Sequence, residues 1–289
     1  CNNDSFTGTI EVIPIKLIPE NQVRKKQTIY LPRKGTVLDL PVFYQGESIS
    51  GRLSLDLSKT KVLDLHVVDI DLVASALFPK TNTSVTLGSF KHHQPPGSET
   101  TQSAVDFDFN IQDHPYETYF GKLLEIRHTI KAKKKDKVIS EQEIILRNKE
   151  LPLPSEQEGR MEIGIERALH LEWIVTNTNI KIGGSIKGRV DFLLLNIQLT
   201  SLEMKLVRKE FLSKKNQCES EVLDSYVFEQ RPSTSELLRF DWQLNSSLTT
   251  TLTPNFYHSE FEVRHYLKLI CIDDKKRNLF KEMEISVQR

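Results

Sequence analysis

Apolar and polar residues alternate with a period of two along much of this chain of 289 residues. Leucine recurs at every second position from Leu53 to position 57. In a second segment, alternate positions are again apolar, with Phe261, Val263, Leu267 and Leu269 on the same face. Period two with one apolar face is typical of half-buried antiparallel strands. Segments of helical period are few and short, and strand signals recur at the spacing of β-sandwiches. The sequence therefore predicts an all-β protein.

The chain repeats itself at a fixed offset. Gly-Glu-Ser-Ile-Ser-Gly-Arg-Leu at 46–53 returns as Gly-Gly-Ser-Ile-Lys-Gly-Arg-Val at 183–190, and 183 − 46 = 137. Ile-Arg-His-Thr-Ile-Lys at 126–131 returns as Val-Arg-His-Tyr-Leu-Lys at 263–268, and 263 − 126 = 137. Two separated matches at one offset indicate two copies of one module. We therefore expect two antiparallel β-sandwich lobes in tandem.

Proline, charge and serine mark the boundary between the copies. The segment 148–160 has the composition of a linker. We predict an N-terminal lobe over 1–147 and a C-terminal lobe over 161–289. A second irregular stretch, Lys80 to Ser103, contains Pro-Pro-Gly and many Ser and Thr residues. It predicts a long surface loop inside the first lobe.

The repeated glycines have a local role in this scheme. Gly46 and Gly183 are expected to allow the positive φ of a tight turn. Gly51 and Gly188 lie inside strands and indicate a bulge or a close backbone approach.

Charge and cysteine content narrow the functional classes. Lys+Arg and Asp+Glu both total 39, so no net field favours nucleic acid or a membrane surface. The three cysteines are Cys1, Cys218 and Cys271, and an odd, scattered set indicates neither a disulfide framework nor a zinc site. We expect a reducing, cytosolic compartment. No apolar run has the length of a membrane span or a signal-peptide core.

No segment has the pattern of an active site. The sequence lacks a Walker loop, a dinucleotide fingerprint, a His-Glu-x-x-His and a Gly-x-Ser-x-Gly motif. His92 and the following histidine have no ligand-spaced partner, so a solvated loop pair is favoured over a metal site. His128 and His265 occupy equivalent positions of the repeat, and we interpret them as half-buried strand residues. The sequence predicts a protein that is not an enzyme and needs no metal or cofactor.

One dense cluster of charge remains. The basic run 131–137 contains Lys133, Lys134 and Lys135. A soluble hairpin tip is the simpler interpretation, and contact with an acidic partner or anionic lipid is the functional one. Interleaved aromatic residues, which nucleic-acid binding would favour, are lacking.

Further informative segments are Leu-Pro-Val-Phe-Tyr-Gln-Gly-Glu-Ser-Ile-Ser-Gly at 40–51, Pro-Tyr-Glu-Thr-Tyr-Phe-Gly at 115–121, Met-Glu-Ile-Gly-Ile-Glu at 161–166, and the stretches 169–172, 192–194 and 263–274. Together they resemble a known family, vacuolar protein sorting-associated protein 26, the arrestin-like subunit of retromer. The resemblance runs nearly end to end. The run Met-Glu-Ile-Gly-Ile-Glu is more specific to retromer than to the sister subunit of the retriever complex.

The resemblance implies an arrestin-like fold and a non-enzymatic role in sorting transmembrane cargo, with the protein cytosolic and peripheral on endosome membranes. It implies that the second lobe docks on a large helical-solenoid subunit of retromer through Val227 and Phe228. It also implies a groove, formed with a sorting nexin, in which a sorting motif of the cargo adds beside an edge strand. Ile163 and Phe280 align with that groove, although both could equally be core residues.

The chain departs from the family pattern in two places. Gln45 stands where the family often has Asp, which weakens the expectation of one sorting-nexin contact. Lys-Lys-Arg at 275–277 replaces an acidic run in the last hairpin. A retriever-type subunit or another arrestin-like trafficking adaptor remains the alternative, although the Pro-Pro-x-Tyr motifs of ubiquitin-ligase adaptors are lacking.

Overall fold

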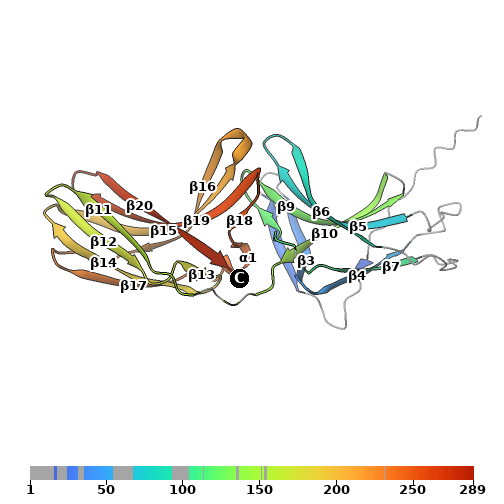
Figure 1. The fold of residues 1–289 in the computed structure, drawn as a ribbon, viewed down its shortest axis with the longest axis horizontal. Helices are drawn as coiled ribbons and strands as arrows, with labels where there is room; N and C mark the ends of the chain where they lie inside the picture. The colour runs from blue at the N-terminus through green and yellow to red at the C-terminus, as the bar shows by residue number, and fades with distance from the viewer. Residues whose placement is uncertain are drawn as a thin grey trace, which may run out of the picture. The chain divides into compact units, whose positions relative to one another are not determined.

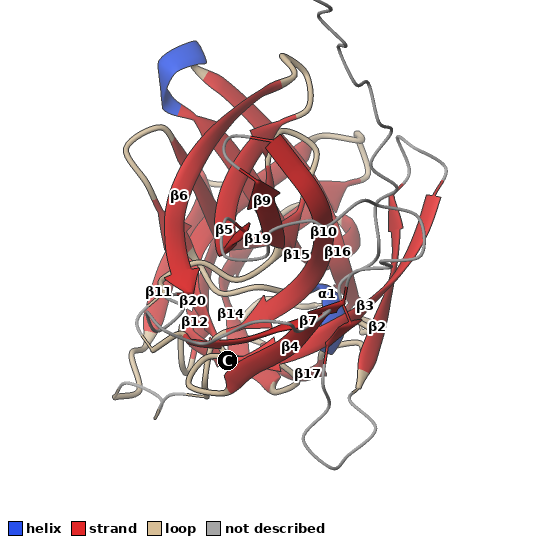
Figure 2. Cartoon of the chain, turned by 90° about the vertical axis from the view of Figure 1, so that its right-hand side faces the viewer, coloured by secondary structure: helices blue, strands red, loops and turns tan. Residues whose placement is uncertain are grey.

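The computed structural model describes residues 16–17, 25–31, 36–54, 68–92, 104–112, 114–134, 137–150, 152, 155–230 and 232–289. Strands dominate these residues, and helix is confined to short segments such as α1 (Leu248–Thr251) and a 3-10 turn at Ser213–Lys215 (Figures 1 and 2). The predicted all-β class is confirmed.

The chain separates into two compact units. Unit 1 contains residues 1–120 and 124–149, and unit 2 contains residues 121–123 and 150–289. Strand β11 (Gly159–Ile165) begins two residues before the predicted second lobe, so the last two residues of the predicted linker belong to a strand. The lobe bounds 1–147 and 161–289 stay a prediction.

Unit 1 has two sheets with a buried cluster between them. The smaller sheet has the order β1 (Lys16–Leu17), β4 (Ser48–Ser54), β7 (Ala104–Asn110). The larger has the order β2 (Lys26–Leu31), β3 (Thr36–Tyr44), β10 (Lys137–Arg147), β9 (Glu125–Lys134), β5 (Val68–Phe78), β6 (Thr83–His92), and β8 (Tyr119–Phe120) pairs with β9. Apolar side chains of both sheets, including Phe107 and Leu72, form one buried cluster between them. This packing is a β-sandwich.

Unit 2 repeats the arrangement. Its four-stranded sheet has the order β11, β12 (Leu169–Val175), β14 (Ser185–Leu195), β17 (Leu237–Gln243). Its six-stranded sheet has the order β13 (Asn179–Lys181), β20 (Asn278–Gln288), β19 (Phe261–Asp273), β15 (Leu199–Leu212), β16 (Gln217–Val227), and β18 (Phe256–Tyr257) pairs with β19. One cluster of buried residues joins the two sheets, with Trp173 and Phe192 from the smaller and Met204 and Leu269 from the larger.

The repeat predicted from the sequence has a structural counterpart. The first match lies on β4 and β14, and the second on β9 and β19. Each larger sheet also contains one parallel pair, β3 with β10 and β13 with β20. The expected antiparallel pairing therefore holds for the other strand pairs of these sheets but not for these two.

The repeated glycines behave alike in the two units. Gly46 and Gly183 have φ of 88° and 83°, which confirms the expected turns. Gly51 lies opposite Phe107, and Gly188 lies opposite Phe240. A Cβ on Gly188 would lie 2.6 Å from Cζ of Phe240, and one on Gly51 would overlap the ring of Phe107. The expected close approach is therefore to an aromatic ring at both glycines, and at Gly188 also to the backbone O of Ile174, which an added Cβ would overlap.

The predicted loop from Lys80 to Ser103 is wrong over its first half. Residues 83–92 form β6, which pairs antiparallel with β5 along its whole length. The Ser and Thr content that suggested a loop is compatible with an edge strand in which half of the residues are exposed and none is buried. Residues 93–103 lie outside the described residues.

Candidate interaction surface

The outer face of the six-stranded sheet brings together two of the predicted sites. Val227 on β16 pairs in register with Glu203 on β15, which pairs with Ile270 on β19, which pairs with Phe280 on β20. Val227 is 59% exposed and Phe280 is 51% exposed. Three strand spacings separate the ends of this row, a distance of about 14 Å. Two apolar side chains predicted for different partners therefore lie on one face of one sheet.

Phe228 differs from its neighbour Val227. It follows the last residue of β16, and its backbone N–H donates to the carbonyl of Leu202 at 3.1 Å. Its ring is half-buried and packs edge-on against Tyr226 and Phe240, with centroid distances of 5.1 and 5.9 Å. Successive side chains of a strand point to opposite faces, so only Val227 of this pair is fully presented to a partner.

Phe280 owes its position to a neighbouring charge. Nζ of Lys268, on the adjacent strand β19, lies 3.8 Å from the ring centroid of Phe280. A cation over an aromatic face is attracted by the ring quadrupole, which helps to orient this exposed ring.

Ile163 lies in the core. It is 4% exposed and belongs to the buried cluster between the sheets of unit 2. Its side chain is therefore withheld from a ligand. Its strand β11 is the end strand of the four-stranded sheet as described, so the group that β11 offers is its backbone edge rather than the isoleucine side chain.

The lysine-rich hairpin is partly neutralised. Nζ of Lys133 forms an ion pair with Asp71 on β5 at 3.0 Å, and the side chain of Asp71 is only 8% exposed. Lys134 ends β9, whereas Lys135 lies outside the described residues. A lipid or acidic-partner contact here stays a prediction.

The two repeat histidines are fully buried, so their interpretation as half-buried residues is wrong. Nδ1 of His128 lies 2.9 Å from Oγ1 of Thr118, and Nδ1 of His265 lies 2.8 Å from Oδ1 of Asn255. Both acceptors also receive a backbone N–H from the last strand of their unit. Alternation placed these rings on the apolar phase, and a polar partner ten residues upstream in each repeat makes their burial possible.

Burial suppresses the charge of these imidazoles. It lowers the pKa of His265 to about 3, with Arg208 adding to the effect. Desolvation, with His114 and Arg147 nearby, lowers the pKa of His128 well below its ordinary value. Burial also lowers the pKa of His114, whose ring centroid is 5.0 Å from that of His128, to about 4. All three are neutral structural groups at neutral pH.

The described residues give little support for a reactive centre. Within the ranges given above, no three His, Cys, Asp or Glu side chains are grouped closely enough to hold a metal ion. Burial raises the pKa of the Cys271 thiol to about 12, which makes it a poor nucleophile. No helix in the described part of the chain is both long enough and apolar enough to cross a bilayer.

Comparison with known proteins identifies the family. The family model for vacuolar protein sorting-associated protein 26 matches residues 9–276. The chain belongs to the vacuolar protein sorting-associated protein 26 family. The protein of that name from Schizosaccharomyces pombe is 26% identical over 288 residues, which cover 96% of this chain and 95% of the relative. Vacuolar protein sorting-associated protein 26B of Mus musculus is 24% identical over 294 residues, 99% of this chain and 87% of the relative.

At this identity the chain is a divergent member of the vacuolar protein sorting-associated protein 26 family, and its fold is the arrestin-like fold of that family. Strand register cannot be derived from one sequence, so the row shared by Val227 and Phe280 could not be predicted. Ile270 lies between them in this row and is outward in phase on β19, although it is only 7% exposed.

Proposed function

We propose that this chain is a non-enzymatic subunit of a retromer-type endosomal sorting complex. It acts in the cytosol as a peripheral component on endosome membranes and helps to select transmembrane cargo for retrograde or recycling transport. Membership of a family named for vacuolar protein sorting supports this role. The observation that carries the proposal is the row on the outer face of the six-stranded sheet, where Val227 and Phe280 are both exposed.

Val227 is proposed as the direct contact to the large helical-solenoid subunit. An exposed aliphatic side chain at the end of a strand can enter a pocket of a partner without reorganisation of its own sheet. Phe228 is proposed as its support, because the ring packs against Tyr226 and Phe240 and fixes the end of β16.

Phe280 is proposed to line the groove for cargo and sorting nexin. Its exposed ring gives an extended peptide an apolar pocket wall, and the backbone edge of β11 gives a strand to pair with. Ile163 supports that edge from the core.

Substitution of Val227 by Asp tests the large-subunit contact. The residue is exposed, so the melting temperature is expected to stay the same, whereas a buried charge at the interface weakens binding by at least about tenfold. The measurement is titration of the purified chain with the purified large subunit of retromer. Val222→Asp is the matched control, because Val222 is on the same strand and is 54% exposed.

Equal binding by Val227→Asp, Val222→Asp and the unchanged chain would remove the site assignment. Capture of the large subunit of retriever in place of that of retromer would favour the alternative, a retriever-type subunit. Phe228→Asp is unsuitable as the sole variant, because loss of its packing is expected to lower the melting temperature as well.

A further inference from the structure

The outer face of the four-stranded sheet in unit 2 carries a row of arginines. Arg160 on β11 pairs in register with Ile174 on β12, which pairs with Arg189 on β14, which pairs with Arg239 on β17. Cross-strand neighbours on one face have Cβ atoms about 5 Å apart. Three guanidinium groups therefore project from one line across the sheet, on a face separate from the row of Val227 and Phe280.

The pairing of Arg189 with Arg239 is unfavourable for the fold. Like charges directly opposite each other destabilise an antiparallel pair. Arg160 is compensated by Glu172 at 2.8 Å, and Arg189 by Asp191 at 3.1 Å. Arg239 is exposed, and its side chain has no ion pair or hydrogen bond with any residue that the structure describes. Its charge is available to an outside ligand.

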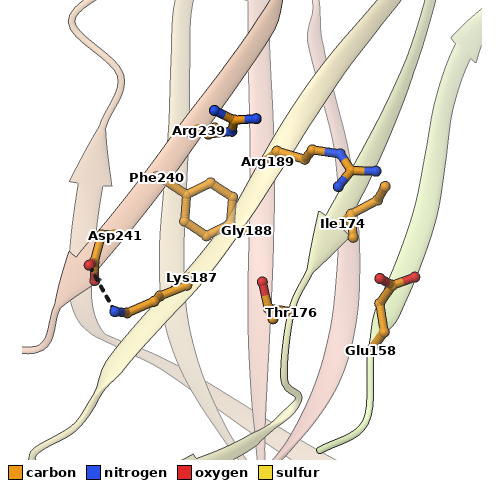
Figure 3. Close-up of a pocket in the computed structure, with 9 residues that line it drawn as sticks. All are labelled: Glu158, Ile174, Thr176, Lys187, Gly188, Arg189, Arg239, Phe240 and Asp241. Atoms are coloured by element: carbon orange, nitrogen blue, oxygen red, sulfur yellow. Dashed lines mark ion pairs between the residues drawn. The ribbon is translucent and has the colours of Figure 1, made fainter.

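A groove of about 570 Å³ opens beside these two arginines. Ile174, only 2% exposed although it points outward, forms the floor together with Thr176. Figure 3 shows Arg189 and Arg239 on neighbouring strands on one side of the groove, with the ion pair of Lys187 and Asp241 farther along the same strands. The groove thus combines the buried aliphatic side chain of Ile174 with arginines at its rim.

Strand β17 adds a second feature to this face. It pairs with β14 along one side and is the last strand in the described order of its sheet. Its burial alternates, with Leu238, Phe240 and Trp242 inside and the intervening residues exposed. An extended segment that paired with β17 would place a side chain directly beside Arg239.

We propose that this face binds an extended acidic segment of a partner protein, which pairs along β17 and places a carboxylate against Arg239 and Arg189. The carboxylate would extend the row of arginines by one strand. Its negative charge would reduce the repulsion between Arg189 and Arg239, which lie opposite each other. A guanidinium matches a carboxylate in geometry and can bind it in a bidentate manner. The segment is expected to have an apolar or small residue two positions from the acid, beside Leu237, and a polar or basic residue on the other side, beside Asp241.

The distribution of charge favours a peptide over a membrane surface. Glu158 and Asp241 line the groove, and Glu172 and Asp191 flank it. A continuous anionic surface would meet these carboxylates together with the arginines. A single acidic side chain inserted at Arg239 avoids them. The site therefore favours a single acidic side chain of an extended peptide over a continuous anionic surface.

The test is a selection of ten-residue peptides from a random display library against the full chain, followed by fluorescence anisotropy with the selected peptides. They are expected to carry Asp or Glu at one fixed position. Arg239→Glu is expected to weaken their binding by at least about tenfold, the loss of a charge-assisted hydrogen bond. Arg167→Glu is the matched control, because Arg167 is an exposed arginine at the turn between β11 and β12 of the same unit.

Thermal unfolding separates this role from a structural one. Arg239→Glu replaces a like-charge pair with an opposite pair, so its melting temperature is expected to equal or exceed that of the unchanged chain. A lower melting temperature would show that Arg239 serves the fold and would overturn the proposal. No selected peptide, selected peptides without an acidic position, or equal binding by both variants would also overturn it. So would Arg239-dependent flotation on phosphatidylserine vesicles without peptide binding.

Discussion

Acidification is expected to destabilise unit 2 through His265. The imidazole is neutral in the folded state, because burial lowers its pKa to about 3, whereas in the unfolded chain its pKa is about 6.5. Below pH 6.5 the imidazole of His265 is therefore protonated in the unfolded chain but not in the folded chain. Stability present above pH 6.5 is lost as the pH falls towards the folded-state pKa.

The size of this loss follows from the two pKa values. Each pH unit between them costs about 1.4 kcal/mol, so a change from pH 7 to pH 5 removes about 2 kcal/mol of unfolding free energy. With a urea dependence of about 2 kcal/mol per molar, the urea midpoint is expected to fall by about 1 M on account of this residue alone.

Tryptophan fluorescence isolates the effect. The chain has 2 tryptophans, and both Trp173 and Trp242 are buried in the core of unit 2. Their emission during urea unfolding at pH 7 and pH 5 therefore reports on the unit that contains His265. Comparison with His265→Asn removes the contribution of other titrating groups, because the asparagine amide keeps a donor for Asn255 but does not titrate. His170→Gln, which removes an exposed imidazole of the same unit, is the control.

Between pH 7 and pH 5, the loss of unfolding free energy is expected to be about 2 kcal/mol smaller in His265→Asn than in the unchanged chain. If both proteins lose the same free energy, His265 does not resist protonation in the folded state. The argument from burial would then be refuted.

Two further substitutions test other groups. Glu117→Gln should destabilise unit 1 by about 3–5 kcal/mol, because it removes the carboxylate that pairs with the buried guanidinium of Arg147 at 3.1 Å. Faster hydrogen exchange of the β10 amides would report this loss, and unchanged exchange would contradict it. If the hairpin touches lipid, Lys134→Gln should weaken the binding free energy to phosphatidylserine vesicles by about 1 kcal/mol, measured by flotation. It avoids the Lys133–Asp71 pair, and equal flotation would argue against a lipid contact.

The fold class followed from the sequence because period-two alternation and a repeat are local signals. Alternation places Leu53 and Val263 in their cores correctly, as both are buried. The strand 83–92 was missed because its Ser and Gly residues and the Pro-Pro-Gly that follows suggest a loop, although Thr, Val and Phe in the segment favour a strand. The segment becomes a strand through its pairing with β5, which precedes it in the chain and lies beside it in the sheet.

The candidate surface was less accessible to sequence reasoning. Resemblance indicated Val227 and Phe280 but could not place them on one row, because the register of β16, β15, β19 and β20 is a long-range property. Ile163 and Phe280 looked alike in the alternation, yet one is buried and the other exposed. The phase of a strand is visible in its sequence, whereas the identity of its covered face depends on the rest of the sheet.

The aromatic rings that lie against the strand glycines restrict how the module can change. Gly51 and Phe107 share one volume, so a methyl group can be added to the first only if the second becomes smaller. At Gly188 a smaller residue in place of Phe240 would not suffice, because an added methyl group would also overlap the backbone O of Ile174. Gly51 and Phe107 must therefore vary together during evolution, whereas the backbone of the neighbouring strand fixes Gly188. The two copies of the module consequently tolerate different changes at the same repeated glycine.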